Sequence, residues 1–192
     1  IELDGPPWRA RKHAVREVEL SAIAPGYAVD RVAAAFVARG VTNYMIEIGG
    51  EIRTAGRNAE RRKWRIGVEQ PDAPPGTPVL ALALSGESVS TSGDYREFFE
   101  SGGRRYSHTI DPRTRRPVEH GLASVSVLAD TCMRADALST AIMVLGPDAG
   151  LALAEREGIA AYLVVRTDNG FEPRYSTAFE PYRASGGDEE SP

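Results

Sequence analysis

Residues 123–166 read ASVSVLADTCMRADALSTAIMVLGPDAGLALAEREGIAAYLVVR, and this stretch decides the fold. Apolar and polar residues alternate over Ala123–Leu128, which predicts a strand, and the apolar run Ile159–Arg166 predicts a buried strand. Two helices are expected between them, over Met133–Leu145 and Asp148–Glu157, because each is followed by a helix-ending glycine. A strand, two helices and a strand in succession are not a regular strand-helix alternation.

Outside this stretch, strands outnumber helices. One further helix is expected over Tyr27–Arg39, and the two prolines of Ile110–Pro117 predict a loop there. Further strands are expected at Asn43–Ile48, Lys63–Glu69, Val79–Leu84 and Ser88–Ser92. The order favours an α+β fold with a largely antiparallel sheet flanked by a few helices. We expect one domain over residues 1–183 and a disordered acidic tail over residues 184–192.

The composition excludes several functional classes. The chain has 192 residues, with 23 basic and 27 acidic side chains and a formal net charge of −4. A net negative charge does not attract the phosphate backbone of nucleic acids, so general nucleic-acid binding is disfavoured. No stretch reaches the roughly 18 apolar residues of a membrane helix. The single cysteine, Cys132, excludes an internal disulfide framework and cannot build a thiolate metal site alone.

Asp136 and Thr140 are the first pair of candidate site residues. They are four apart on an expected helix, so a carboxylate and a hydroxyl share one face. Both are hard oxygen ligands that suit Mg²⁺ when a backbone carbonyl and substrate oxygens complete the shell. The alternative is structural: Asp136 is a first-turn acid and the Thr140 hydroxyl bonds back into its own helix.

A hydroxyl-rich turn, SVSTSGDY over Ser88–Tyr95, is the second candidate. Its hydroxyls and backbone N–H groups could wrap a phosphate, but an ordinary strand end also fits. Neither GxxxxGK[ST] nor GxGxxG occurs in the sequence, so nucleotide binding by those loops is unsupported.

His108, in the segment RRYSHTIDP, is the candidate general base. A histidine between a strand and a loop can exchange protons near neutral pH, although such a residue can also be structural. We interpret His13 and His120 as surface residues. Cys132 has no histidine nearby in sequence and is expected to pack in the interior rather than act as a nucleophile.

Five segments in order carry a resemblance to a known family. They are ELSAIAPGYAVDR (19–31), IEIGGEIRTAGR (46–57), VSTSGDYREFFE (89–100), YSHTIDPRTRRPV (106–118) and ADALSTAIMVLGP (135–147). Together they resemble the FAD:protein FMN transferases, the ApbE-like family, over about residues 19–179. The resemblance implies a T-fold-related core, with Tyr175–Tyr182 as the last strand.

The resemblance also implies an activity. Members use Mg²⁺ to split the pyrophosphate of FAD and attach FMN to a Thr or Ser hydroxyl of a target flavoprotein, releasing AMP. The expected partners are therefore FAD and an acceptor flavoprotein. The alternatives are an FAD pyrophosphatase, in which water replaces the acceptor hydroxyl, and a flavin-binding module without turnover. The family is usually exported or lipid-anchored on the bacterial inner membrane, facing the periplasm.

Site residues follow from the family's motifs. The metal ligands map onto the Ala22 carbonyl and the side chains of Asp136 and Thr140, with Ser139 where some members carry a further Asp. His108 maps onto the expected base or phosphate-orienting group. The expected flavin and phosphate contacts are Glu19, Pro25, Ser92, Gly93 and Ile110.

The family's N-terminal portion has no counterpart before Glu19, and the sequence begins at Ile1 rather than at methionine. We therefore expect this chain to be the C-terminal part of a longer protein.

Overall fold

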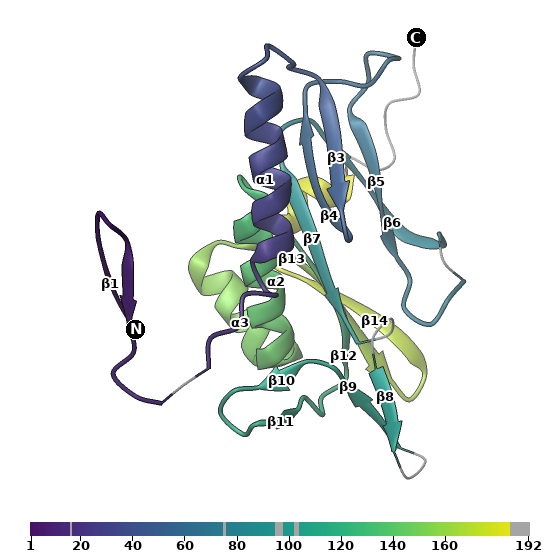
Figure 1. Cartoon of the computed structure of the whole chain (residues 1–192). Coiled ribbons are helices and arrows are strands. Elements are labelled where there is room, and N and C mark those ends of the chain that lie inside the picture. The colour runs from purple at the N-terminus through teal and green to yellow at the C-terminus, as the bar shows by residue number, and fades with distance from the viewer. Residues whose placement is uncertain (16, 75, 95–97, 102–103, 185–192) are drawn as a thin grey trace.

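The computed structural model describes residues 1–15, 17–74, 76–94, 98–101 and 104–184. Its main strands are β3 (Tyr44–Ile48), β4 (Glu51–Ala55), β7 (Ser88–Gly93), β12 (Leu122–Ala129), β13 (Ala160–Thr167) and β14 (Gly170–Tyr175). They form a six-stranded sheet in the order β14-β13-β12-β7-β4-β3 (Figure 1), and every neighbouring pair is antiparallel. The predicted α+β fold with a largely antiparallel sheet is confirmed.

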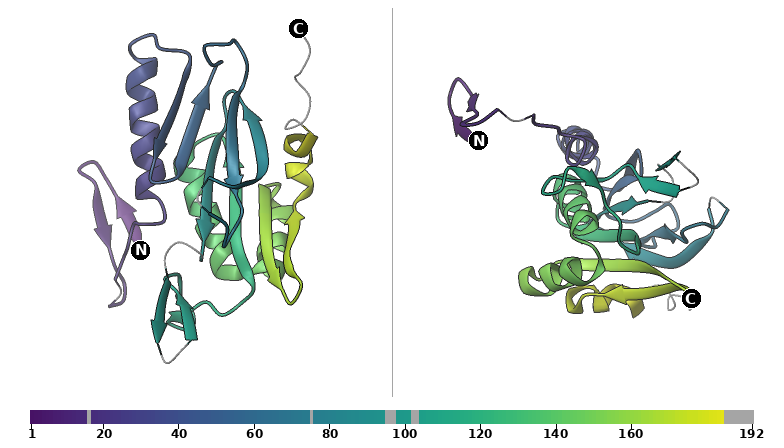
Figure 2. Two further views of the ribbon diagram at one scale, coloured as in Figure 1. Left: turned by 90° about the vertical axis from the view of Figure 1, so that its right-hand side faces the viewer. Right: turned by 90° about the horizontal axis from the view of Figure 1, so that it is seen from below.

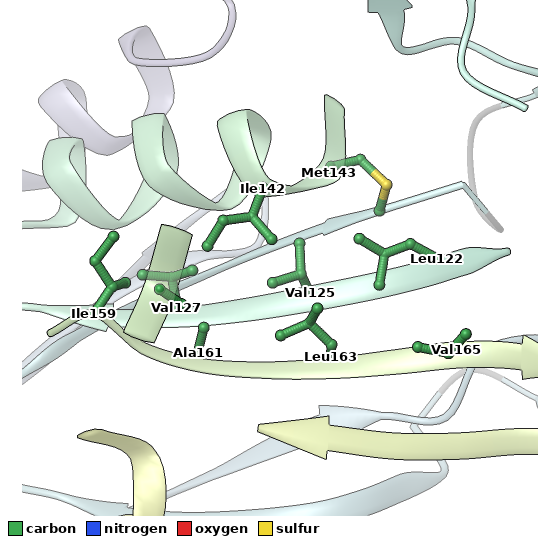
Figure 3. Close-up of a cluster of buried hydrophobic side chains, with 10 residues drawn as sticks. Leu122, Val125, Val127, Ile142, Met143, Ile159, Ala161, Leu163 and Val165 are labelled. Atoms are coloured by element: carbon green, nitrogen blue, oxygen red, sulfur yellow. The ribbon is translucent and has the colours of Figure 1, made fainter. Parts of the chain in front are cut away.

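Three helices cover one face of this sheet (Figure 1, Figure 2): α1 (Ala24–Val37), α2 (Cys132–Leu145) and α3 (Pro147–Glu157). Between α2 and strands β12 and β13, Ile142 and Met143 pack against Val125 and Leu163, and all four side chains are fully buried (Figure 3). Burial of one such side chain stabilises the fold by about 1.5–3 kcal/mol. This core fixes α2 over the middle of the sheet.

Helix α1 starts earlier than the pattern predicts. It begins at Ala24, whereas the sequence predicts a start at Tyr27. Pro25 lies in its first turn. The backbone N–H that proline lacks would have no hydrogen-bond partner within the helix at this position. Helices α2 and α3 lie where they are predicted, within one residue at each end.

A hairpin covers the opposite face of the sheet. Strands β5 (Trp64–Glu69) and β6 (Pro78–Leu84) pair with each other, and Leu82 and Leu84 pack against Phe179. Strands β6 and β7 are consecutive in sequence, but they belong to different sheets.

The predicted last strand, Tyr175–Tyr182, is wrong. Strand β14 ends at Tyr175, and a 3₁₀ turn (Thr177–Phe179) and helix α4 (Glu180–Ala184) follow. Phe179 and Tyr182 are three residues apart and both pack on the β5–β6 cluster. A helical turn places such a pair on one side, whereas a strand would place them on opposite faces. The acidic tail predicted for residues 184–192 lies outside the described residues apart from Ala184.

Three short hairpins complete the described chain. One of them lies within the predicted loop 110–117, where β10 (Ile110–Asp111) pairs with β11 (Arg116–Pro117). Only two residues of each strand are paired. The others are β1 (Glu2–Asp4) with β2 (Arg9–Arg11), which lies apart from the sheet in Figure 2, and β8 (Phe98–Ser101) with β9 (Arg104–Ser107). None of the helices in the described ranges has the length and apolar character needed to cross a membrane.

Candidate functional site

The N-termini of α1 and α2 meet, and each is capped by a carboxylate of the other helix. The Gly26 N–H of α1 donates to Asp136 Oδ2 of α2 over 3.0 Å. In return, the N–H groups of Cys132 and Met133 donate to the two carboxylate oxygens of Asp30, each over 3.0 Å. Helix α1 has no acidic residue in its first turn and no side-chain cap from its own N-cap residue. Both carboxylates therefore lie where the helix dipoles favour negative charge.

This exchange requires an unusually close approach of the two helices. A Cβ at Gly26 would lie 2.6 Å from the Cys132 carbonyl oxygen and 2.7 Å from the Met133 Cα. Because the Gly26 N–H donates to Asp136, it does not donate to the carbonyl four residues earlier, that of Ala22. The Ala22 carbonyl, on the segment that enters α1, therefore does not accept that helical hydrogen bond.

Strand β7 joins the junction through hydroxyl groups. The Ser90 and Ser92 hydroxyls share hydrogen bonds of 3.2 and 2.9 Å with the Ser139 hydroxyl of α2. Ser92 also lies 3.4 Å from the Thr140 hydroxyl, and Ser139 donates to the Asp136 carbonyl over 3.0 Å. The hydroxyl-rich turn and the Asp136/Thr140 pair, far apart in the sequence, therefore belong to one polar cluster. Gly93 follows at the end of β7.

The surroundings of two carboxyl groups at this site disfavour their ionised form. Asp136 is only 4% exposed, and burial raises the pKa of its carboxyl. Burial also raises the pKa of Glu51, the first residue of β4, to about 7, and repulsion from Asp136 adds to this effect. Sequence reasoning missed Glu51 as a site residue, although the residue lies within one of the five segments that carry the family resemblance, in the run IEIGGEIR.

The donor set fits a small divalent cation. Asp136 Oδ1, the Thr140 hydroxyl and the Ala22 carbonyl are all hard oxygen donors, and Mg²⁺ usually takes only one or two protein carboxylates. In the described part of the chain, no three His, Cys, Asp or Glu side chains are grouped closely enough to hold a metal among themselves. A cation here would therefore depend on hydroxyl and carbonyl oxygens as well as on carboxylates.

The predicted base lies on the segment that enters β10, and β10 contacts α2. His108 is exposed, and Ile110 is 48% exposed. Asp111 anchors this segment by accepting hydrogen bonds from the N–H and the guanidinium of Arg113, which hold the pKa of Asp111 below its usual range. An anchored turn with an exposed imidazole suits a group that meets substrate from solvent.

The other predicted flavin contacts precede α1 or lie in its first turn. Glu19 is exposed and accepts hydrogen bonds from the hydroxyl and the N–H of Ser21, which lower the pKa of Glu19. Pro25 is half-buried in the first turn of α1. Both lie on the segment that carries Ala22, and their contacts with a flavin stay predictions.

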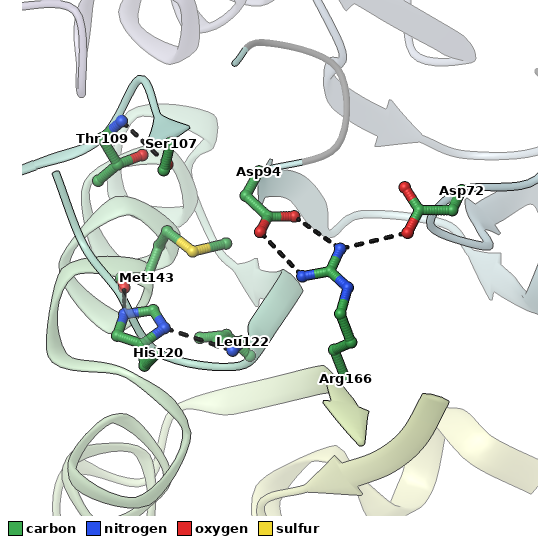
Figure 4. A network of polar contacts seen from close by, with 8 residues as sticks. All are labelled: Asp72, Asp94, Ser107, Thr109, His120, Leu122, Met143 and Arg166. Carbon is green, nitrogen blue, oxygen red and sulfur yellow. Dashed lines mark hydrogen bonds and ion pairs between the residues drawn. The ribbon is translucent and has the colours of Figure 1, made fainter. Parts of the chain in front are cut away.

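Arg166 anchors the chain just beyond Gly93 (Figure 4). Its guanidinium forms ion pairs with Asp94 at 3.1 Å and with Asp72 at 3.2 Å. The first links β13 to the end of β7, and the second reaches the β5–β6 connection. Sequence reasoning missed these two ion pairs, because their three residues are spread over 95 positions of the chain.

Cys132 is fully buried, and burial raises the pKa of its thiol to about 12. The prediction that it packs in the interior is confirmed.

His120 is not the surface residue that the sequence predicts. It is half-buried, and the Leu122 N–H donates to its Nδ1 over 3.3 Å. Its Nε2 therefore carries the proton and donates to the Met143 carbonyl over 2.7 Å (Figure 4). The ring also packs on Gly146, where a Cβ would lie 2.7 Å from the imidazole. His120 thus joins the C-terminal end of α2 to the start of β12.

Replacing His120 by Ala is expected to destabilise the protein by about 1–3 kcal/mol, because a backbone carbonyl and a backbone N–H lose their partner. Urea denaturation measures the change in the free energy of unfolding. His13→Ala is the matched control, since His13 is exposed and its ion pair is with the exposed Glu2. Equal urea midpoints for the two variants would contradict the structural role.

Comparisons with known proteins identify the family of the chain. A family model described as the ApbE family matches residues 1–163. The FAD:protein FMN transferases of Haemophilus influenzae and Vibrio cholerae are 48% and 44% identical to the chain, over 85% and 86% of its length. A crystal structure of the Pseudomonas stutzeri flavinyl transferase ApbE in its apo form superposes with a TM-score of 0.78 at 49% identity, covering 88% of this chain and 52% of that one. The Vibrio cholerae flavin transferase ApbE gives a TM-score of 0.77 at 43% identity, covering 86% and 52%. The chain spans 47% and 49% of the two transferase sequences, about half of each.

Proposed function

Because the chain belongs to the ApbE family, we propose that the protein transfers FMN from FAD to a Thr or Ser side chain of an acceptor flavoprotein and releases AMP. The observation that carries this proposal is the α1–α2 junction, where Asp136 caps α1, the helix that follows Ala22, and the Thr140 hydroxyl lies 3.4 Å from that of Ser92. The transferases named above support the same reaction for this chain.

We propose that Ala22, Asp136 and Thr140 hold a Mg²⁺ ion. Such an ion neutralises charge on the pyrophosphate oxygens of FAD and orients them. Asp136 is suited to this role because Gly26 fixes one of its carboxylate oxygens and leaves the other available. The hydrogen bonds from Ser92 and Ser139 restrict the rotamers of the neighbouring hydroxyls and so pre-organise the donors.

In the proposed reaction, the acceptor hydroxyl oxygen bonds to the FMN phosphorus, and the phosphorus–oxygen bond to AMP breaks. His108 takes the proton of the attacking hydroxyl, and AMP leaves with the electron pair of the broken bond. Ser92 and Gly93 contact the phosphates, whereas Glu19, Pro25 and Ile110 contact the flavin. Ile110 is partly exposed and apolar, which suits contact with a planar ring.

Replacing His108 by Ala is expected to lower kcat by about 100-fold, in the range of general acid–base catalysis, with little change in FAD affinity. Single-turnover transfer measures the chemical step, and quenching of flavin fluorescence measures FAD binding. A large loss of FAD affinity would instead make His108 a binding residue.

One incubation separates the proposed reaction from its alternatives. The protein is mixed with FAD, Mg²⁺ and an acceptor domain that carries a Thr flavinylation site. A transferase makes the acceptor fluorescent in a denaturing gel and releases AMP. A pyrophosphatase, which the exposure of His108 to water would permit, releases both FMN and AMP without labelling the acceptor. A flavin-binding module produces none of these, and that outcome refutes the proposal.

We propose that the protein acts on the periplasmic side of the bacterial inner membrane, where its family usually works. Fractionation of cells that produce the complete protein, followed by protease treatment of intact spheroplasts, tests this location.

A further inference from the structure

Glu51 belongs to β4, a strand that contacts α2, the helix that carries Asp136 and Thr140. It opens β4, directly after the turn Gly49–Gly50, in which both glycines have positive φ. Residues two apart on a strand share a face, and Arg53 on that face forms an ion pair with Asp30 of α1. Glu51 therefore faces the helices, and its carboxylate lies over the turn, with Oε2 3.2 Å from the position that a Cβ of Gly49 would take.

The register of the sheet places Glu51 level with the hydroxyl cluster. Arg53 pairs with Ser88 in the antiparallel β4–β7 ladder, so Glu51 comes opposite Ser90. The Ser90 hydroxyl bonds to Ser139, and it favours the charged form of the Glu51 carboxyl. Through Ser139 and Ser92 this network continues to Thr140. Glu51 thus lies beside the hydroxyl network that also reaches Asp136.

The charged groups that act most strongly on the Glu51 carboxyl are negative. They are Asp136 and Glu47, and both disfavour its ionised form. The nearest cation on its own strand, Arg53, is engaged by Asp30. Across the described ranges, no Lys, Arg or His lies within ion-pair distance of Glu51 or Asp136. Two partly buried carboxylates without a counter-charge are unfavourable, and a cation between them removes that cost.

We propose that Glu51 supplies the second negative charge of the metal site, next to Asp136. This inference rests on the metal site of the proposed function and extends it by one residue. With Asp136 alone, the cation would meet one carboxylate, a hydroxyl and a carbonyl. With Glu51, the protein balances the charge of a divalent ion fully. Ligand charge is one of the main factors that set the affinity of oxygen sites for divalent cations.

The test is Mn²⁺ binding to the protein without FAD, followed by the EPR signal of free Mn²⁺ at one fixed pH. Glu51→Gln keeps the size and the hydrogen-bond acceptor but removes the charge, and it is expected to weaken Mn²⁺ binding at least 10-fold. Glu47→Gln is the matched control, because Glu47 is an exposed neighbour on β3, and it is expected to change the affinity less than 2-fold. Circular dichroism confirms that both variants are folded.

The possible outcomes are distinct. Unchanged Mn²⁺ affinity in Glu51→Gln together with weak binding in Asp136→Asn overturns the role of Glu51 and leaves the proposed metal site intact. Unchanged affinity in both variants overturns the metal site as well. An equal loss of Mn²⁺ affinity in Glu47→Gln and Glu51→Gln also overturns the proposal. In that case the affinity depends on the total negative charge of the region and not on a specific ligand.

Discussion

Replacing Asp136 by Asn is expected to lower FMN transfer at least 1000-fold while the protein stays folded. The amide oxygen of Asn can still accept the hydrogen bond from the Gly26 N–H, so the helix junction is kept. The negative charge that would hold Mg²⁺ is lost, and metal ions contribute several kcal/mol to transition states of this kind. A loss of about 4 kcal/mol corresponds to about 1000-fold in rate. In-gel flavin fluorescence of the acceptor, followed over time, measures this change.

The same variant carries an internal control for folding. Burial raises the pKa of Asp136, which means that the charged carboxylate is disfavoured in the folded protein without metal. At neutral pH, Asp136→Asn is therefore expected to leave the Tm of the metal-free protein unchanged or to raise it. A Tm increase on addition of Mg²⁺ is expected for the wild type and not for the variant. Undiminished Mg²⁺-dependent transfer by Asp136→Asn would refute the assignment of the metal site.

Replacing Gly26 by Ala is expected to destabilise the protein by about 3 kcal/mol or more. Helix propensity alone would favour Ala by about 1 kcal/mol. The new Cβ, however, would lie 2.6 Å from the Cys132 carbonyl oxygen and 2.7 Å from the Met133 Cα, both backbone atoms that cannot rotate away. Helices α1 and α2 must therefore separate, which weakens the hydrogen bonds at Asp136 and Asp30. For a chain of this length, about 3 kcal/mol lowers Tm by roughly 6–12 °C.

Gly86→Ala is the matched control for this variant. Gly86 is exposed in the β6–β7 connection, and no atom lies within 4 Å of an added Cβ. Its Tm is expected to differ from that of the wild type by less than about 2 °C, since exposed substitutions rarely exceed ±0.5 kcal/mol. A similar Tm for Gly26→Ala and Gly86→Ala would show that the helix junction can open without cost.

Local patterns predict most of the elements of this fold because those elements form where their own residues favour them. Helices α2 and α3 end at glycines that the sequence shows, Gly146 and Gly158, and Gly158 adopts the left-handed conformation typical of a helix end. The i, i+4 spacing of Asp136 and Thr140 likewise predicts that both residues share one face of α2.

The errors arise where distant parts of the chain decide the outcome. The family resemblance predicts a strand over Tyr175–Tyr182, but Phe179 and Tyr182 both pack on the β5–β6 cluster, which requires a helical turn. His120 has no neighbour in sequence that explains it, because its acceptor is a carbonyl 23 residues away. Glu51 becomes relevant only when β4 pairs with β7 and α2 covers both.

The reciprocal caps between α1 and α2 have a consequence for protein synthesis. The hydrogen bond from Gly26 to Asp136 spans 110 residues, and the bond from Cys132 to Asp30 spans 102. Everything that separates these partners, including β3, β4 and β7, must leave the ribosome before either cap can form. The nascent chain therefore carries an α1 whose amino end is uncapped until α2 emerges, and the junction that would hold the metal closes in the same step that completes this helix pair.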